Sequence, residues 1–157
     1  MTKNQCHGRF VESFGRLHLA QSLHDAGYVC AEPLIDNGID LVAFSPKSKR
    51  ITTLQMKASS KDRYDVKRKY DGKVDLLVFV FHATSANPEI YVVAYADIVR
   101  DLIETNGYDK NPSWTREDNA GWGGTINKNS RAKFDSWRAT PERWRALLET
   151  IRTGGST

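Results

Sequence analysis

The chain has 157 residues, of which 39% are hydrophobic and 27% charged. This composition excludes a disordered chain and predicts one folded domain over residues 1–152, followed by a short flexible tail over 153–157. The formal net charge of +4 favours an acidic partner. The longest strictly apolar run covers residues 76–81 and is too short to span a membrane, so we expect a cytoplasmic protein with no membrane partner.

The first predicted element is a helix over residues 8–26, a stretch without proline that ends before Gly27. Its apolar side chains fall on two opposite sides, with Phe10, Phe14 and Leu17 on one and Leu19 and Leu23 on the other. A helix with this pattern is expected to be covered on both sides.

Five segments rich in β-branched and aromatic residues predict strands, and they cover residues 28–35, 39–44, 51–57, 75–81 and 89–95. Asn37-Gly38 suits a tight hairpin turn between the first two. The fourth is almost wholly apolar, which is typical of a strand buried on both faces. A basic stretch over residues 61–73 links the third strand to the fourth.

The last third of the chain predicts two helices on either side of an aperiodic region. Residues 97–106 form the first, ended by Gly107, and residues 108–129 form a loop region packed by its own aromatic side chains. Thr140 and Pro141 open the last helix, whose apolar stripe comprises Trp144, Leu147, Leu148 and Ile151. The fold class is therefore α/β (α+β), with one mixed central sheet flanked by helices.

Polar side chains converge on one face of the predicted sheet. If Phe44 lies opposite Ile51 in an antiparallel pair, Asp40 lies opposite Gln55, and Lys57 follows on the same face. A carboxylate and an amide oxygen suit a divalent metal ion, and the amine would then hold or activate a water. The alternative interpretations are a turn residue for Asp40 and an exposed polar strand face for the other two.

Three segments in this order, GRFVESFGRLHLAQSLHDAGYVC, DNGIDLVAF and ITTLQMKAS, resemble the PD-(D/E)XK nuclease superfamily, and the resemblance covers residues 8–60. It implies a restriction-endonuclease-like core of order α-β-β-β-α-β with extra C-terminal helices. Asp40 falls at the metal-binding aspartate and Lys57 at the catalytic lysine of this family. Gln55 stands where most members carry glutamate, which gives a QxK motif.

The same resemblance implies a metal-dependent endonuclease that hydrolyses DNA with Mg²⁺ or Mn²⁺, and a homodimer. Glu12 would be the acid from the helix, and the backbone carbonyl of Met56 would complete the metal ligands. Arg16 stands at the more usual position of that acid, so a surface ion pair between Glu12 and Arg16 is the alternative interpretation. A nuclease fold with a decayed site that binds nucleic acid or a protein is the alternative function.

The basic stretch predicts contacts to DNA phosphates, made by Lys61, Arg63, Lys67, Arg68 and Lys69. A solvated surface is the alternative. Tyr64, Tyr70 and the four tryptophans are expected to pack, with Trp122 the best placed to contact nucleic acid. The histidines and cysteines have no zinc spacing, no P-loop is present, and both cysteines are expected to be reduced.

Overall fold

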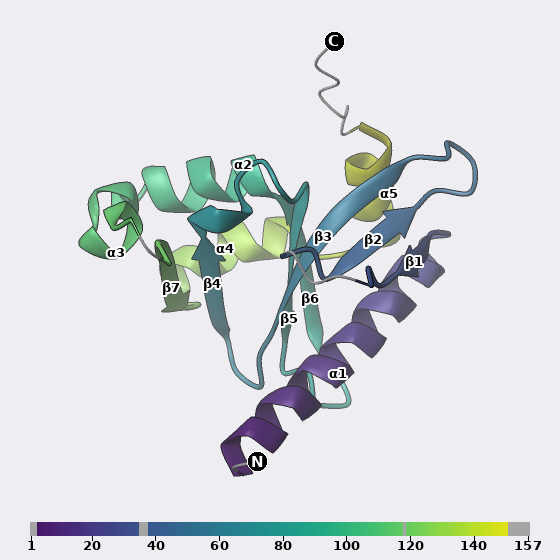
Figure 1. Ribbon diagram of the computed structural model, residues 1–157, viewed down its shortest axis with the longest axis horizontal. Coiled ribbons are helices and arrows are strands. Elements are labelled where there is room, and N and C mark those ends of the chain that lie inside the picture. The colour runs from purple at the N-terminus through teal and green to yellow at the C-terminus, as the bar shows by residue number, and fades with distance from the viewer. Residues whose placement is uncertain (1–2, 35–37, 118, 151–157) are drawn as a thin grey trace.

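The computed structural model describes residues 3–34, 38–117 and 119–150, with side chains described from residue 7 to residue 149. A mixed five-stranded sheet with the order β1-β2-β3-β5-β6 forms its centre, and helices flank it (Figure 1). Its strands are β1 (Val29–Ala31), β2 (Leu41–Phe44), β3 (Ile51–Ala58), β5 (Leu76–Phe81) and β6 (Glu89–Ala94). The predicted fold class is confirmed.

The pairing of β2 with β3 fixes which residues face the site. The two strands are antiparallel with Phe44 opposite Ile51 and Leu41 opposite Leu54, so the predicted register is confirmed. β3 and β5 run parallel, and β5 pairs antiparallel with β6. Because β2 begins at Leu41, the residues of β3 beyond Gln55 have no partner strand on that side.

Two apolar cores lie on the two faces of the sheet. Alternate residues of β5 point into each: Val78 and Val80 into one, Phe79 and Phe81 into the other. The first core is covered by the helices α1 (Lys3–Asp25) and α5 (Pro141–Thr150). All six residues of β5 are buried, so the prediction of a strand buried on both faces is confirmed.

The region around α1 differs from the prediction in two ways. Leu19 and Leu23 are buried, but Phe10 and Leu17 are 53% and 67% exposed, so the expectation that the helix is covered on both sides is wrong. The sheet lies against one side of α1 only. The first strand is shorter than predicted, and residues 32–40 connect it to β2, so the connection is longer than a two-residue turn. Residues 35–37, including Asn37 of the expected turn, lie outside the described residues.

The connection between the parallel strands β3 and β5 is a strand, β4 (Arg63–Lys67), followed by the 3-10 helix η1 (Arg68–Tyr70). The resemblance implied a helix here, and the alternative of a solvated surface also missed the strand. β4 pairs antiparallel with β7 (Gly121–Thr125) as a separate two-stranded sheet. Tyr64 and Val66 point into the second core, and the charged residues that alternate with them resemble those of a linker in the sequence.

The last third of the chain is more regular than predicted. Residues 108–129 contain η3 (Tyr108–Lys110), α3 (Pro112–Thr115) and β7, although the expected aromatic packing is present as a stack of Tyr108 on Trp122. The helix predicted over 97–106 is a single turn, α2 (Tyr95–Ile98), continued by the π-helical η2 (Val99–Glu104).

The helix α4 (Lys128–Ser136) was not predicted. It begins with a capping box formed by Asn127 and Ser130, and its sequence has no strong apolar stripe from which a helix could be predicted. The N-cap of α5 is as expected, with the Thr140 hydroxyl accepting a hydrogen bond from the Arg143 N–H. Ile151 and the predicted tail lie outside the described residues.

In the part of the chain that the structure describes, no helix is long and apolar enough to cross a membrane. Cys30 is a free thiol, in agreement with the prediction of reduced cysteines, and the side chain of Cys6 lies outside the described residues. Trp114, Trp137 and Trp144 are buried, as expected of packing residues.

Candidate metal and phosphodiester site

A polar cavity of about 360 Å³ lies at the end of β3, where this strand extends beyond β2. One wall comes from the N-terminal half of α1 and the opposite wall from η1. The residues that line it are Gly8, Glu12, Gly38, Asp40, Gln55, Met56, Lys57, Ala58, Lys69 and Tyr70. The structure thus brings Asp40, Gln55, Lys57, Met56 and Glu12 to one cavity.

Asp40 is held by hydrogen bonds from β3. Its Oδ2 atom accepts a hydrogen bond of 2.8 Å from the Met56 N–H and a second one from the Gln55 amide. The Asp40 N–H donates to the Leu54 carbonyl, which continues the β2–β3 pairing by one residue. The carboxylate therefore has a fixed position at the point where the two strands separate.

Gln55 is 5% exposed, and its Oε1 atom has no hydrogen-bond partner among the residues that the structure describes. Its Nε2 atom donates both to Asp40 and to the Met56 carbonyl, the latter over 3.2 Å. A buried carbonyl oxygen without a donor costs free energy, which a bound cation would recover.

Burial raises the pKa of Asp40 above its ordinary value, although the hydrogen bond from Met56 and the charge of Lys57 act in the opposite direction. The negative charge on this carboxylate is therefore incompletely stabilised by the protein itself. A cation bound in the cavity would stabilise it further.

Lys57 is held by Tyr70 of η1. Its Nζ atom lies 2.7 Å from the Tyr70 hydroxyl oxygen and 5.0 Å from the centre of the Tyr70 ring. The Lys69 ammonium lies 5.4 Å from the same ring. Tyr70 is 3% exposed, so its position is fixed by packing, and the two amines are positioned by their contacts with it.

Glu12 approaches the cavity because α1 packs very closely on β3. A Cβ atom at Gly15 would lie 2.6 Å from the Cβ of Ala58, so only glycine permits this approach. The Glu12 carboxylate pairs with Arg16 at 2.9 Å, and Arg16 also pairs with Glu32 at 3.2 Å. The ion pair of the alternative interpretation is thus present, and Glu12 also lines the cavity.

The basic residues predicted to bind DNA lie along β4, η1 and the turn before them. Lys61, Arg63, Arg68 and Lys69 are exposed, and within the described ranges none of the four has a carboxylate within 4.0 Å. Lys67 is partly buried and pairs with Asp65 at 3.4 Å. Only Lys69 lines the cavity itself. Trp122 is partly buried in its stack on Tyr108, and Tyr64 and Tyr70 are buried, which agrees with packing roles.

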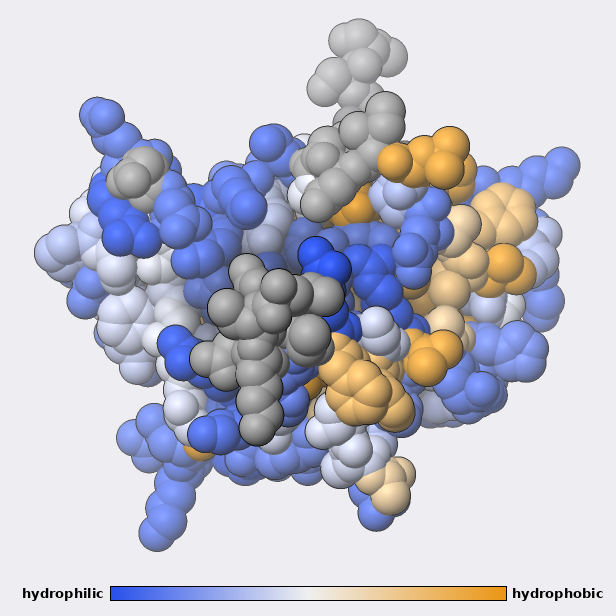
Figure 2. All heavy atoms as spheres, turned by 60° about the horizontal axis from the view of Figure 1, so that its bottom comes forward, coloured by the Kyte–Doolittle hydropathy of each residue, from blue (hydrophilic) through white to orange (hydrophobic). Residues whose placement is uncertain are grey.

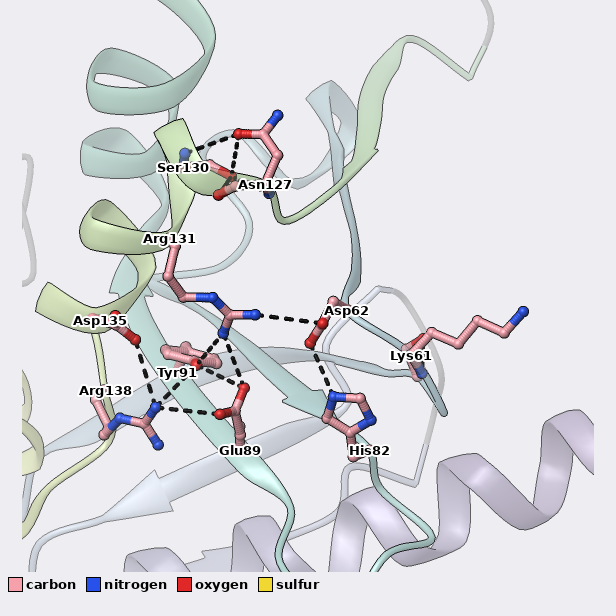
Figure 3. Close-up of polar contacts among 11 residues, drawn as sticks. Lys61, Asp62, His82, Glu89, Tyr91, Asn127, Ser130, Arg131, Asp135 and Arg138 are labelled. Carbon is pink, nitrogen blue, oxygen red and sulfur yellow. Dashed lines mark hydrogen bonds and ion pairs between the residues drawn. The ribbon is translucent and has the colours of Figure 1, made fainter.

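A second group of polar residues was not foreseen. Ligand atoms of Asp62, His82 and Glu89 lie within 4.8 Å of one another, a spacing that a metal ion could use. Figure 3 shows the Arg131 guanidinium between the two carboxylates. It lies 3.4 Å from Asp62 and 3.2 Å from Glu89, and His82 lies 3.0 Å from Asp62.

The charges of this second group are balanced by the protein. Glu89 accepts hydrogen bonds from Tyr91, Arg131 and Arg138 (Figure 3). Burial would raise the pKa of Glu89, but these hydrogen bonds outweigh it and leave the pKa lowered. Burial, together with the hydrogen bond to Glu89, raises the pKa of Tyr91 to about 12. Because a cation already lies between the carboxylates, we assign no metal to this group.

Sequence reasoning missed two features of the site, Tyr70 as the partner of Lys57 and the second polar group. The sequence suggests only a stacking or packing role for Tyr70. Its place is decided by the 3-10 turn of η1, which has no periodic signal in three residues. Asp62 precedes β4, His82 follows β5 and Glu89 begins β6, so the three residues share no sequence motif.

No family model matches the chain, and no curated protein does. Among solved structures, the fold is similar to that of a bacterial homing endonuclease, I-Ssp6803I, with 14% sequence identity and a TM-score of 0.49. The alignment covers 95% of this chain and 94% of that one. At this level of similarity, we transfer no function from that protein, and the site itself has to carry the functional conclusion.

Proposed function

We propose that the chain is a metal-dependent endonuclease that hydrolyses phosphodiester bonds of DNA, of the PD-(D/E)XK type. One observation carries the proposal: Gln55 donates its amide Nε2 to the Asp40 carboxylate and keeps a buried amide oxygen that has no partner among the described residues, and both residues line one cavity with Lys57. Most buried polar atoms in proteins have a hydrogen-bond partner, so the Gln55 oxygen is available to a ligand.

The residues present fit a Mg²⁺ or Mn²⁺ ion. Such ions prefer oxygen ligands, and the residues that line the cavity carry the Asp40 carboxylate, the Met56 carbonyl and the Glu12 carboxylate. The buried Gln55 oxygen would join them once the amide group turns, because its Nε2 now faces Asp40. When bound, the ion would lower the pKa of a water and stabilise negative charge on the phosphate. With one carboxylate fewer than a three-acid site, affinity for the free ion should be modest.

The chain's own residues position the reacting groups. Lys57, anchored by Tyr70, would orient the attacking water through its ammonium group, and Lys69 would attract the phosphate to the same cavity. The Met56 N–H keeps the Asp40 carboxylate fixed in place. Water, phosphate and carboxylate would thereby be brought together without large rearrangement.

A module with a decayed site is the second candidate. The hydrogen bond from the Gln55 amide to Asp40 favours it, because this bond holds the two side chains together without a metal ion. The two candidates differ in one inexpensive measurement. A decayed module should gain no melting temperature in Mg²⁺ or Mn²⁺, whereas a metal site should be stabilised as the ion concentration passes its dissociation constant.

The decisive test is a cleavage assay on linear, branched and single-stranded DNA with Mg²⁺ or Mn²⁺. We expect cleavage that stops on chelation and falls at least about 100-fold in Lys57→Ala, with DNA binding and fold retained. Lys47→Ala, in the exposed β2–β3 turn, is the matched control and should cleave like the parent. Cleavage by Lys57→Ala at the parent's rate would refute the assigned role of Lys57.

We further propose that two copies act together, because a single site cuts one strand at a time. Apolar side chains exposed on α1 and β1, which include Phe10, Leu17 and Val29, offer a surface for such an association. Figure 2 shows apolar residues gathered on the side of the molecule formed by α1 and the β1–β2 edge. Light scattering would measure the oligomeric state. The cytoplasmic location expected from the sequence stays a prediction.

A further inference from the structure

A second hollow of about 710 Å³ adjoins the catalytic cavity and is here called the η1–α3 groove. Its walls are η1 and the turn that follows α3, and its lining residues are Arg68, Lys69, Asp71, Thr115, Arg116, Glu117, Asn119 and Ala120. Lys69 lines both hollows. We propose that the η1–α3 groove binds the phosphate backbone of the DNA strand as it leaves the catalytic cavity, an inference that rests on the proposed function.

Each of the two arginines of the groove donates a side-chain hydrogen bond to a backbone carbonyl. Arg68 Nη1 donates to the Trp114 carbonyl over 3.3 Å, and Arg116 Nη2 donates to the Asn119 carbonyl over 3.0 Å. Within the described ranges, neither guanidinium has a carboxylate within 4.0 Å. A carbonyl occupies one N–H group and leaves the positive charge and the remaining donors free for a phosphate.

The two walls of the groove are tied to each other. The Arg68 N–H donates to the Ala120 carbonyl over 2.9 Å, and Gly121 packs directly against the backbone of Val66. Asn119 has a φ of 45°, the left-handed conformation that turns the chain back toward β7. Backbone hydrogen bonds therefore tie η1 to the segment just before β7, and Arg68 lies at this junction.

Two acidic residues, Asp71 and Glu117, also line the groove. The described lining of the groove carries three cations and two carboxylates, and this mixed charge suits a strand whose phosphates lie along the basic side better than a compact multivalent anion. If a phosphate lies beside Arg116, the neighbouring Glu117 carboxylate repels it. Removing that charge should therefore strengthen binding, whereas removing Arg116 should weaken it.

The test measures binding of a fluorescent DNA duplex at several salt concentrations, with Ca²⁺ in place of Mg²⁺. The logarithm of the affinity falls linearly with the logarithm of the salt concentration, and each phosphate contact makes this slope steeper by about 0.9. We expect Arg116→Ala to lose about one such contact and to bind several-fold more weakly, Arg116→Lys to keep the slope, and Glu117→Gln to bind more tightly.

Lys47→Ala is the control, since it removes one exposed positive charge from the β2–β3 turn at the opposite end of the molecule (Figure 1). A parent that binds no duplex, or equal slopes for Arg116→Ala and Lys47→Ala, would overturn the groove proposal. If the parent cleaves DNA and Arg116→Ala binds DNA normally, the groove proposal fails and the endonuclease proposal stands. If the parent does not cleave DNA but the salt dependence of binding is weaker in Arg116→Ala, the groove proposal stands and the endonuclease proposal fails.

Discussion

Two polar clusters of this molecule are built from similar residues and differ in how their charges are balanced. Around Asp40, burial raises the pKa of the carboxyl, and the Gln55 amide oxygen lacks a partner in the described part of the chain. Around Glu89, two arginines and a tyrosine surround the carboxylate and leave its pKa lowered.

We use this difference to distinguish a candidate site from a structural network. A carboxylate whose hydrogen bonds and charges are complete within the protein stabilises the fold and has little to offer a ligand. A carboxylate that is buried with too few partners destabilises the metal-free fold, and a ligand can recover that free energy. The spacing of acidic groups alone favours the cluster around Glu89, where ligand atoms of three side chains lie within 4.8 Å of one another among the described residues.

The sharpest test of this comparison changes the charge of the proposed metal site around Asp40. Gln55→Glu should tighten Mg²⁺ binding by about tenfold, because it adds a carboxylate to the ligands, and Glu12→Gln should loosen it. Calorimetric titration with Mg²⁺ or Mn²⁺ would measure the metal affinity of both variants and of the parent.

Arg16→Ala is the control for Glu12, although it breaks the pair with Glu32 as well. If Glu12 is only a surface partner of Arg16, the two variants should show similarly small stability changes and no change in metal affinity. Parental metal binding by Glu12→Gln would remove Glu12 from the site.

A smaller effect is expected when only the anchor of Lys57 is changed. Tyr70→Phe keeps the ring and removes the hydroxyl that contacts the Lys57 amine, so kcat should fall about five-fold while KM stays near the parent's value. The pH profile of kcat should shift, which a merely structural role would not produce. Equal losses in thermal stability and activity, with an unchanged pH profile, would contradict the positioning role.

Breaking the second cluster should affect folding and not chemistry. Arg131→Met leaves Asp62 and Glu89 without their shared cation, and we expect the free energy of unfolding to fall by about 1 kcal/mol. DNA cleavage should stay at the parent's rate. Urea denaturation and the cleavage assay together decide this, and lost cleavage in a well-folded variant would reverse the assignment of the two clusters.

The smallest effect concerns the pH dependence of stability. The pKa of Asp40 is raised in the folded protein, so stability from this group is complete below its ordinary pKa of 3.8 and is lost as pH rises through the folded value. At neutral pH, metal-free Asp40→Asn should therefore melt slightly above the parent, and the gain should disappear near pH 4. Adding Mg²⁺ should stabilise the parent more than the variant. A lower Tm for the metal-free variant at neutral pH would contradict this.

The predictable parts of the fold are those with strong local patterns. The alternation of residues 51–57 and the apolar run of residues 75–81 predicted β3 and β5, and counting from Phe44 and Ile51 predicted the register. β4 and β7 were missed because charged residues and glycines fill the outward positions of their two-stranded sheet. Glycine is required at position 121, because a Cβ atom there would lie 2.6 Å from the Val66 carbonyl oxygen. In the sequence, however, a glycine at this place indicates a loop.

Alternation along β3 and an assumed pairing of Phe44 with Ile51 were enough to predict that Asp40, Gln55 and Lys57 share a sheet face, because both are local rules. What surrounds these three residues depends on tertiary contacts. The close packing of α1 at Gly15 brings Glu12 to the cavity, and the non-helical crossover through β4 and η1 places Tyr70 against Lys57. These contacts join elements that are distant in the sequence. Their energies depend on how deeply the groups are buried and on which hydrogen-bond partners they lack, and a sequence pattern shows neither.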